Sequence, residues 1–249
     1  MGTEEQAGLG HQTAAEDFDS YKDKYDDEIN SALGIPGLKV DYFTKVKADI
    51  FLETIEAHFG DAKSCSVLDV GCGIGNNHGL IGPYVGSLSG VDVSEKSLEM
   101  AAERNPSVAY KSYDGNVLPF PDEHFDVVYA ICVVHHVPVV NWPGFFSELR
   151  RVLKPGGIAT IFDHNPINPL SMWVVNRCPF DADAVLLRQS KMRSLLDGAG
   201  FQGVTSRSIL TIPSFGKITR SIDKAFGRLP FGAQYLAIGE KQNAGSTDV

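Results

Sequence analysis

The residues with the clearest chemical potential form a glycine-rich loop that directly follows a short apolar stretch. Glycine allows the backbone to turn tightly and lets a ligand lie against the main chain. Where such a loop opens a helix, the N–H groups of the helix N-terminus also face the ligand. We therefore predict a cofactor-binding loop made of Asp69, Val70, Gly71, Cys72, Gly73 and Gly75.

Two features of this loop bear on which cofactor it binds. The dinucleotide fingerprint G-x-G-x-x-G would place its third glycine at position 76, where the chain has Asn76. The carboxylate of Asp69 would repel a pyrophosphate but attract a cationic ligand. S-adenosylmethionine carries a sulfonium and an ammonium and no phosphate. The loop therefore favours S-adenosylmethionine, with an NAD(P)-dependent oxidoreductase as the alternative.

Two more acidic residues end later apolar stretches. Asp92, followed by Val93, comes about 20 residues after the glycines, where a carboxylate can accept both hydroxyls of a ribose. Ser94 can cap the following helix in its place. Asp114, with Gly115 and Asn116, falls beside the expected adenine, and a turn-forming role is the alternative for this aspartate. These five residues, Asp92, Val93, Asp114, Gly115 and Asn116, complete the predicted nucleoside site.

The elements that position these residues alternate along the chain. Apolar strands are expected at 66–70, 87–91, 108–112, 125–131, 157–162, 203–210 and 233–239, and helices at 41–59, 76–84, 95–104, 142–153 and 184–199. Strand and helix in alternation favour a parallel sheet with helices on both faces. The predicted fold class is α/β, a Rossmann-like, doubly wound sheet.

Composition and charge limit the organisation and the partners. We expect a flexible acidic tail at 1–17, an N-terminal helical cap at 18–60, a catalytic domain at 61–241 with a lid-like insertion at 211–231, and a tail at 242–249. The net charge of −9 and the lack of a base-reading motif argue against a nucleic-acid partner. Without an apolar run long enough to span a bilayer or a legible secretion signal, stable membrane insertion is not expected, and the predicted location is cytoplasmic.

At this point the motifs resemble a known family. The chain is similar to the class I S-adenosylmethionine-dependent methyltransferases, in particular the small-molecule group with a type 11-like methyltransferase domain. The matching segments, in the family's order, are 69–75, 90–92, 114–120, 125–128, 135–137 and 148–157.

The resemblance implies a role for each matched segment. Asp69 and the backbone of 71–75 would hold the methionine end of the cofactor, Asp92 its ribose, and Asp114 with Gly115 its adenine. Ala130 and Ile131 would line the sulfonium. The resemblance also implies a seven-stranded sheet whose last strand is antiparallel, and S-adenosyl-L-homocysteine as the product.

Methyl transfer is an in-line displacement that depends mainly on positioning the acceptor and excluding water. A hydroxyl or carbon acceptor also needs a general base. Histidine titrates near neutrality, so the candidates are His164 with Asp163, and His136. For His135 and His136 a packing role is the alternative.

No metal is expected, because three consecutive residues such as 163–165 rarely converge on one ion. The acceptor is expected to be a small molecule. Four aromatic residues of the leading helices either close over the cofactor as a lid or belong to the core, namely Tyr21, Tyr25, Tyr42 and Phe43. With Trp173, Phe215 and Phe226 they suggest an apolar acceptor pocket. The basic segment 188–228 suggests an anionic group on the acceptor, with a solvated helix face as the alternative. A non-catalytic S-adenosylmethionine-binding protein remains a third hypothesis. The sequence leaves the oligomeric state open.

Overall fold

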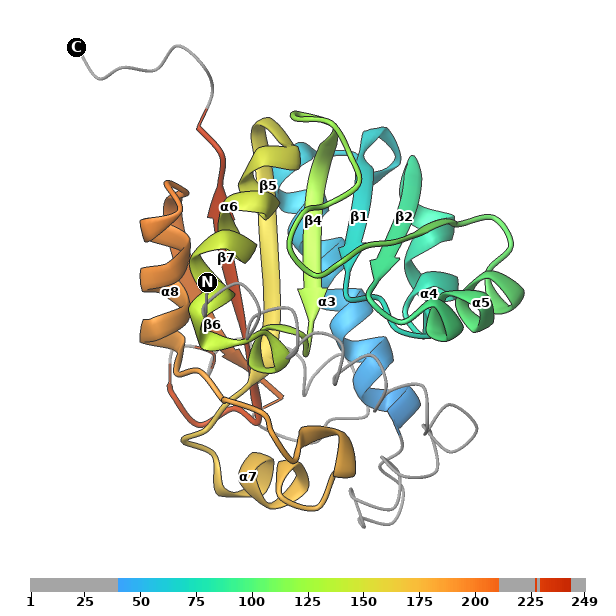
Figure 1. Ribbon diagram of the computed structural model, residues 1–249. Coiled ribbons are helices and arrows are strands. Elements are labelled where there is room, and N and C mark those ends of the chain that lie inside the picture. The colour runs from blue at the N-terminus through green and yellow to red at the C-terminus, as the bar shows by residue number, and fades with distance from the viewer. Residues whose placement is uncertain (1–39, 211–226, 228, 243–249) are drawn as a thin grey trace, which may run out of the picture.

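Seven strands form one mixed sheet in the order β3-β2-β1-β4-β5-β7-β6 (Figure 1). The computed structural model describes residues 40–210, 227 and 229–242. The strands are β1 Ser66–Val70, β2 Ser87–Asp92, β3 Ala109–Ser112, β4 Phe125–Ile131, β5 Leu153–His164, β6 Gln202–Ile209 and β7 Gln234–Glu240. Strands β1 to β5 pair in parallel, whereas β7 is antiparallel to both β5 and β6. The predicted seven-stranded sheet with an antiparallel last strand is confirmed.

The helices lie close to most of their predicted positions. They are α3 Val40–Phe59, α4 His78–Ile81, α5 Glu95–Arg104, α6 Trp142–Val152, α7 Pro169–Val175 and α8 Gln189–Gly198, with short 3-10 turns η1 Ala62–Ser64, η2 Gly82–Tyr84, η3 Val134–His136, η4 Val139–Asn141 and η5 Pro179–Asp181. The helix predicted at 76–84 is divided between α4 and η2. Ser94 caps α5, because its Oγ accepts the N–H of Ser97 at 3.1 Å.

Two helices differ from the sequence prediction. The helix predicted at 184–199 begins only at Gln189, because the N–H of Val185 donates to the carbonyl of His135 at 2.8 Å and holds that segment against a loop. Residues 169–175, for which no helix was predicted, form α7. Asn168 caps this helix by accepting the N–H of Ser171 at 2.9 Å, and Pro169 occupies its first turn, where proline is tolerated.

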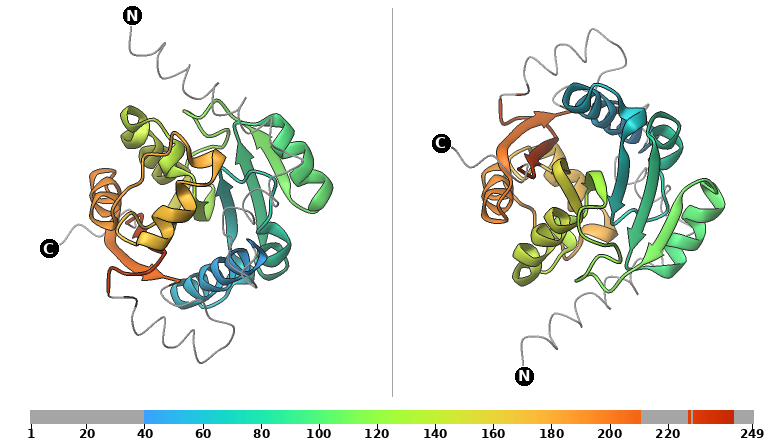
Figure 2. Two further views of the ribbon diagram at one scale, coloured as in Figure 1. Left: turned by 90° about the horizontal axis from the view of Figure 1, so that it is seen from below. Right: turned by 90° about the horizontal axis from the view of Figure 1, so that it is seen from above.

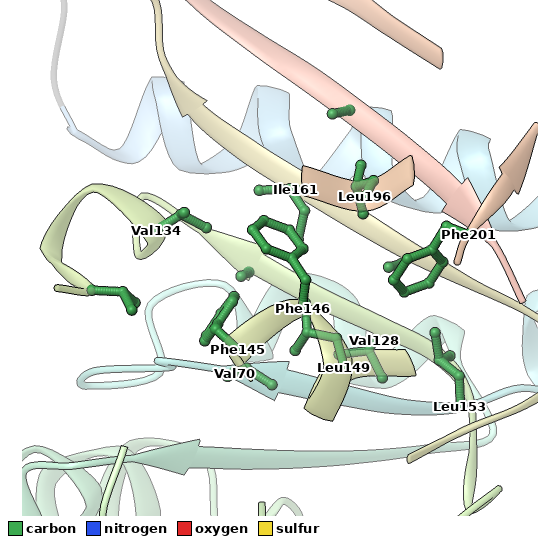
Figure 3. Packing of buried hydrophobic residues seen from close by; sticks show 14 of the residues in the cluster. Val70, Val128, Val134, Phe145, Phe146, Leu149, Leu153, Ile161, Leu196 and Phe201 are labelled. Carbon is green, nitrogen blue, oxygen red and sulfur yellow. The ribbon is translucent and has the colours of Figure 1, made fainter. Parts of the chain in front are cut away.

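Apolar side chains cover both faces of the sheet. Val128 and Ala130 of β4 face the core beneath α6 and α8, and their neighbours Val127 and Tyr129 belong to the core beneath α3 and α4. Figure 3 shows Phe146 of α6 pointing toward the strands of the first core. This double burial explains why β4 reads as a continuous apolar run rather than an alternating one.

The parallel strands all end at one edge of the sheet, where α7 lies (Figures 1 and 2). In an open α/β sheet, ligands bind outside the carboxyl ends of the strands, where the strand order reverses. Strands β1 and β4 are neighbours but lead to opposite halves of the sheet, so the reversal falls between them. The fold therefore directs the functional site to the edge that holds the glycine loop.

The predicted tail 1–17, the first part of the helical cap and nearly all of the insertion 211–231 lie outside the described residues. So do Tyr21, Tyr25, Phe215 and Phe226, and the basic residues Lys217, Arg220, Lys224 and Arg228. The assignments to a tail, a cap and a lid-like insertion stay predictions. Of the predicted aromatic lid, Tyr42 and Phe43 are described, and both pack against the core beneath α3 and α4, as the alternative had it.

Candidate functional site

The glycine loop has the backbone geometry that its sequence predicts. Gly71, Gly73 and Gly75 have φ values of +75°, +50° and +70°, in the left-handed region that favours glycine. A Cβ built on Gly71 would lie 2.6 Å from Cγ2 of Val133, so no side chain fits there. A Cβ built on Gly73 would meet no atom within 4 Å. The loop therefore packs closely on the segment after β4 at Gly71 and is open at Gly73.

Asp92 joins the end of β2 to this loop. Its Oδ2 accepts the N–H of Gly73 at 2.8 Å, and its Oδ1 accepts the N–H of Ser94 at 2.9 Å. Burial raises the pKa of Asp92, and the N–H groups of Ser94 and Gly73 only partly oppose that rise. Each carboxylate oxygen keeps a second lone pair, so this side chain can still accept hydroxyl donors.

Asp69 lies beneath the loop, at 3% exposure, rather than on its surface. Its Oδ2 is 3.0 Å from Nε2 of His78, and Nδ1 of the same ring is 2.6 Å from the hydroxyl of Tyr110. The helix opened by the loop is thereby tied to β1 and β3. The sequence analysis did not predict a role for His78. The signal that could have indicated one is the position of this histidine at the start of the helix after the glycine loop, where its side chain can reach the preceding strand.

Asp114 forms the turn that the sequence left as an alternative. Its exposed carboxylate accepts the N–H of Asn116 at 2.9 Å and of Val117 at 3.0 Å, and these bonds hold its pKa below the ordinary value. Gly115, at φ +81°, follows in a conformation that suits glycine. Gly115 and Asn116 line a small pocket together with Val70 and Tyr113. The turn does not occupy every acceptor site of Asp114, so its predicted adenine contact stays open.

Beyond β4 the chain carries a cysteine that sequence reasoning did not place in the site. Ala130 is buried and Ile131 is half-buried, and the next residue, Cys132, has a φ of +58°. The Nζ of Lys47, from α3, lies 3.9 Å from Cys132 Sγ. Burial opposes the thiolate, but Lys47 and His164 overcome it and lower the pKa of Cys132 to about 7. No local spacing brings residues 47 and 132 together, so only the fold reveals this pair.

The two candidates at the end of β5 lie in one hydrogen-bonded cluster. Asp163 is fully buried, and its Oδ1 is 2.5 Å from Nδ1 of His135 and 2.7 Å from the backbone nitrogen of His164. Burial opposes its charge, but His135 holds the pKa of Asp163 below the ordinary value. Burial also opposes the charge of His164, yet Cys132 raises the pKa of this histidine. Both predicted residues therefore lie at the expected edge.

His136 and its neighbour His135 both have their Nε2 atoms close to the carboxylate of Asp181. The Oδ1 of Asp181 is 3.4 Å from Nε2 of His135 and 3.5 Å from Nε2 of His136. Burial, with the neighbouring His135, lowers the pKa of His136 to about 3. Asp181 comes from η5, after α7, and no sequence motif marked it.

The sequence matches a known family in the part that holds the glycine loop, Asp92, Asp114 and His135, whereas Asp163, His164 and Asp181 lie beyond the matched segment. Residues 68–161 match a family model described as "Methyltransferase domain". Residues 68–161 are therefore similar to a methyltransferase domain, and the seven-stranded order with its antiparallel last strand is the arrangement that the resemblance to the class I S-adenosylmethionine-dependent methyltransferases implies.

Several curated proteins are similar to part of this chain. A 2-methyl-6-phytyl-1,4-hydroquinone methyltransferase from Synechocystis is 35% identical over 116 residues, which is 43% of this chain and 36% of that protein. A sterol 24-C-methyltransferase from Gibberella zeae is 36% identical over 43% of this chain and 29% of its own length. Squalene methyltransferase 1 from Botryococcus braunii is 30% identical over 60% and 43%, respectively. The matches thus span less than half the length of these relatives.

Solved structures share the fold at low sequence identity. A possible histamine N-methyltransferase from Thermotoga maritima has a TM-score of 0.58 and 18% identity, covering 81% of this chain and 89% of its own. A methyltransferase from Archaeoglobus fulgidus has the same TM-score, 20% identity and coverages of 78% and 94%. Among the described residues, no helix combines the length and apolar character needed to cross a bilayer.

Proposed function

We propose that the protein is an S-adenosylmethionine-dependent methyltransferase that acts on a small molecule. The observation that carries this proposal is the joint between the glycine loop and Asp92, in which Gly73 N–H and Asp92 Oδ2 lie 2.8 Å apart. This joint brings an open stretch of backbone next to a carboxylate with spare acceptor capacity. Such a pair suits the ribose of a nucleoside ligand, and the choice of S-adenosylmethionine over a dinucleotide rests on Asp69 and on Asn76.

The residues at this edge fit the cofactor that the family uses. Asp92 would accept the ribose hydroxyls, Gly73 leaves room above the loop, and the turn formed by Asp114 and Gly115 would contact the adenine. Bound there, S-adenosylmethionine supplies an activated methyl group on a positively charged sulfur. The buried charge of Asp69 beneath the loop supports a cation rather than a diphosphate. The relatives' names also favour methyl transfer over the NAD(P)-dependent alternative.

The acceptor, on this proposal, is largely apolar. Large hydrophobic side chains are exposed around α7 and on the nearby segment 229–232, namely Ile167, Leu170, Trp173, Leu229 and Phe231. Asn168 ties the two segments together, since its Nδ2 donates to the carbonyl of Phe231 at 2.6 Å. Relatives named for sterol, squalene and phytyl-hydroquinone substrates agree with an apolar acceptor.

The general base, on this proposal, belongs to the cluster at the end of β5. Asp163 holds this cluster together, because its Oδ1 bonds both to the ring Nδ1 of His135 and to the backbone N–H of His164. His164, half-buried and next to Cys132, remains the residue assigned to receive the acceptor's proton. The adjacent His136 is the second candidate.

Calorimetric titration of the full chain with S-adenosylmethionine, S-adenosylhomocysteine and NADH tests the cofactor assignment. We expect heat with the first two and none with NADH; binding of NADH alone would overturn the proposal. Incubation with radiolabelled S-adenosylmethionine and a panel of prenylated quinols, sterols and polyprenes then tests transfer. Cofactor binding without label transfer to any acceptor would favour the non-catalytic alternative.

A further inference from the structure

Three side chains from two separate loops direct their ligand atoms at one point. His135 and His136 come from η3, after β4, and Asp181 from η5, after α7. Potential ligand atoms of the three residues all lie within 4.8 Å of one another. This cluster lies at the carboxyl edge of the sheet, where the acceptor is proposed to bind.

The hydrogen bond between His135 and Asp163 decides which ring nitrogen of His135 is left to face His136 and Asp181. Nδ1 is 2.5 Å from the carboxylate of Asp163, which accepts only, so the Nδ1 proton belongs to that bond. Nε2 therefore faces Asp181. It is buried and has no hydrogen-bond partner, because 3.4 Å is too long for a good N–H···O bond.

A positive charge is required between these atoms. With a neutral ring, the lone pair of Nε2 would point at a carboxylate oxygen, and both would be acceptors with no donor between them. The ring of His135 thus lies between two carboxylates, with Asp163 Oδ1 at 2.5 Å from Nδ1 and Asp181 Oδ1 at 3.4 Å from Nε2. Either a second proton on His135 or a metal ion would supply the positive charge between Nε2 of His135 and the carboxylate of Asp181.

The spacing fits a metal ion. Zinc binds imidazole nitrogen and carboxylate oxygen at about 2.0–2.2 Å with tetrahedral angles, which puts neighbouring ligand atoms about 3.3–3.5 Å apart. The two distances from Asp181 Oδ1 are 3.4 Å to His135 and 3.5 Å to His136. A set of two imidazoles and one carboxylate favours zinc over magnesium or calcium, which prefer oxygen ligands.

We propose that His135, His136 and Asp181 form a zinc-binding site. Asp163 is its outer partner: a carboxylate that accepts the other N–H of a ligating histidine fixes the ring and strengthens the ligand. The proposal departs from the expectation, drawn from consecutive residues alone, that the chain holds no metal.

Three protein ligands leave a fourth tetrahedral position for water or substrate. The side chains of His136 and Asp181 are 21% and 10% exposed, so the cluster is not sealed. An oxygen of the acceptor would bind there, and the metal would lower the pKa of a hydroxyl. This role rests on the proposed methyl transfer, whereas the metal site itself does not.

The test uses the full, tag-free chain, stripped with EDTA and then freed of chelator. Titration with zinc chloride by calorimetry should give one site per chain, and cobalt(II) should give the visible absorption of a tetrahedral ion. Asp181→Asn and His136→Ala should each weaken zinc binding at least tenfold. Asp163→Asn should weaken it by about 10- to 100-fold through the outer shell.

Matched controls are the exposed residues Asp183 and His58. Asp183→Asn and His58→Ala should leave zinc affinity unchanged, and circular dichroism should confirm that every variant is folded. Absence of stoichiometric binding, or binding that survives Asp181→Asn and His136→Ala, would overturn the proposal. If the same preparation binds S-adenosylmethionine but no zinc, a proton alone occupies the cluster and the methyltransferase proposal stands.

Discussion

Oδ2 of Asp92 accepts the N–H of Gly73 at 2.8 Å, which connects the carboxyl end of β2 to the loop that follows β1. The two residues are 19 positions apart in the chain, and the strands β1 and β2 that lead to them pair in parallel. The contact holds the loop in place before any ligand binds. The carboxylate is thus already oriented for a diol, which reduces the ordering that a cofactor must bring about.

The first prediction concerns this carboxylate. Asp92→Ala should weaken S-adenosylmethionine binding by about 1–3 kcal/mol, because the hydroxyls lose a buried acceptor. Calorimetry should report about a 5- to 150-fold larger Kd. Glu99→Ala, on the exposed side of α5, is the control. An unchanged affinity in the Asp92 variant would remove the ribose assignment.

The second prediction separates two glycines of one loop. Gly71→Ala should destabilise the fold, because its methyl group would collide with Val133 as well as strain the backbone. In Gly73→Ala the new methyl group would contact no neighbouring atom, so the free energy of unfolding should fall only by the backbone strain of about 1–2 kcal/mol. The same methyl group would, however, enter the space proposed for the cofactor. Urea unfolding and calorimetry on both variants check this contrast. Equal losses of stability, with cofactor affinity intact in Gly73→Ala, would contradict it.

The third prediction concerns the buried chain from Asp69 through His78 to Tyr110. His78→Phe should destabilise the protein by about 2–3 kcal/mol, since it leaves the carboxylate of Asp69 buried without that partner. Tyr110→Phe removes only the hydroxyl at the other end and should cost about 1 kcal/mol. Denaturant titrations measure both values. A larger loss from Tyr110→Phe would show that Asp69 does not depend on His78.

The fourth prediction is a pH dependence of stability. Asp126 accepts hydrogen bonds from Lys154 Nζ at 2.8 Å and from Ser66 N at 2.8 Å. Burial opposes its charge, but these donors hold the pKa of Asp126 below the ordinary value. Its contribution is therefore complete above the unfolded pKa of about 4 and is lost as pH falls through the lower folded value.

Urea unfolding between pH 7 and pH 3 should show this loss in the difference between wild type and Asp126→Asn. The gap should be largest near neutrality and should shrink below about pH 4. Asp197→Asn, at an exposed position of α8, is the control. A gap that stays constant down to pH 3 would mean that the charge of Asp126 is not what stabilises the fold.

The fifth prediction concerns the base. His164→Ala should lower turnover while leaving S-adenosylmethionine affinity nearly intact, because its ring lies by Cys132 and Gln234 rather than by the glycine loop. Single-turnover assays and calorimetry on the same samples separate the two effects. Joint loss of affinity and turnover would indicate a structural role for His164.

Particular elements show which parts of the fold can be predicted from the sequence. The strand preceding Gly71 and the strand at 125–131 are evident because parallel strands buried on both faces are continuous apolar runs. The helix at 169–175 was missed, because a single helical turn or two started by Asn168 and Pro169 carries too little periodicity to be recognised. The start of α8 was placed too early, because the bond from Val185 to His135 connects residues 50 positions apart.

By itself the sequence determined the α/β class, the glycine loop and the acids at the ends of β1, β2 and β3, since each depends on spacing within one strand-loop-helix unit. Only the tertiary structure joined His135 and His136 to Asp181, paired His78 with Asp69, and brought Lys47 to Cys132. Local spacing is set by backbone geometry that every sequence shares. Contacts between distant loops depend on how strands are ordered in the sheet and how helices pack on it, and this is decided only when the whole chain folds.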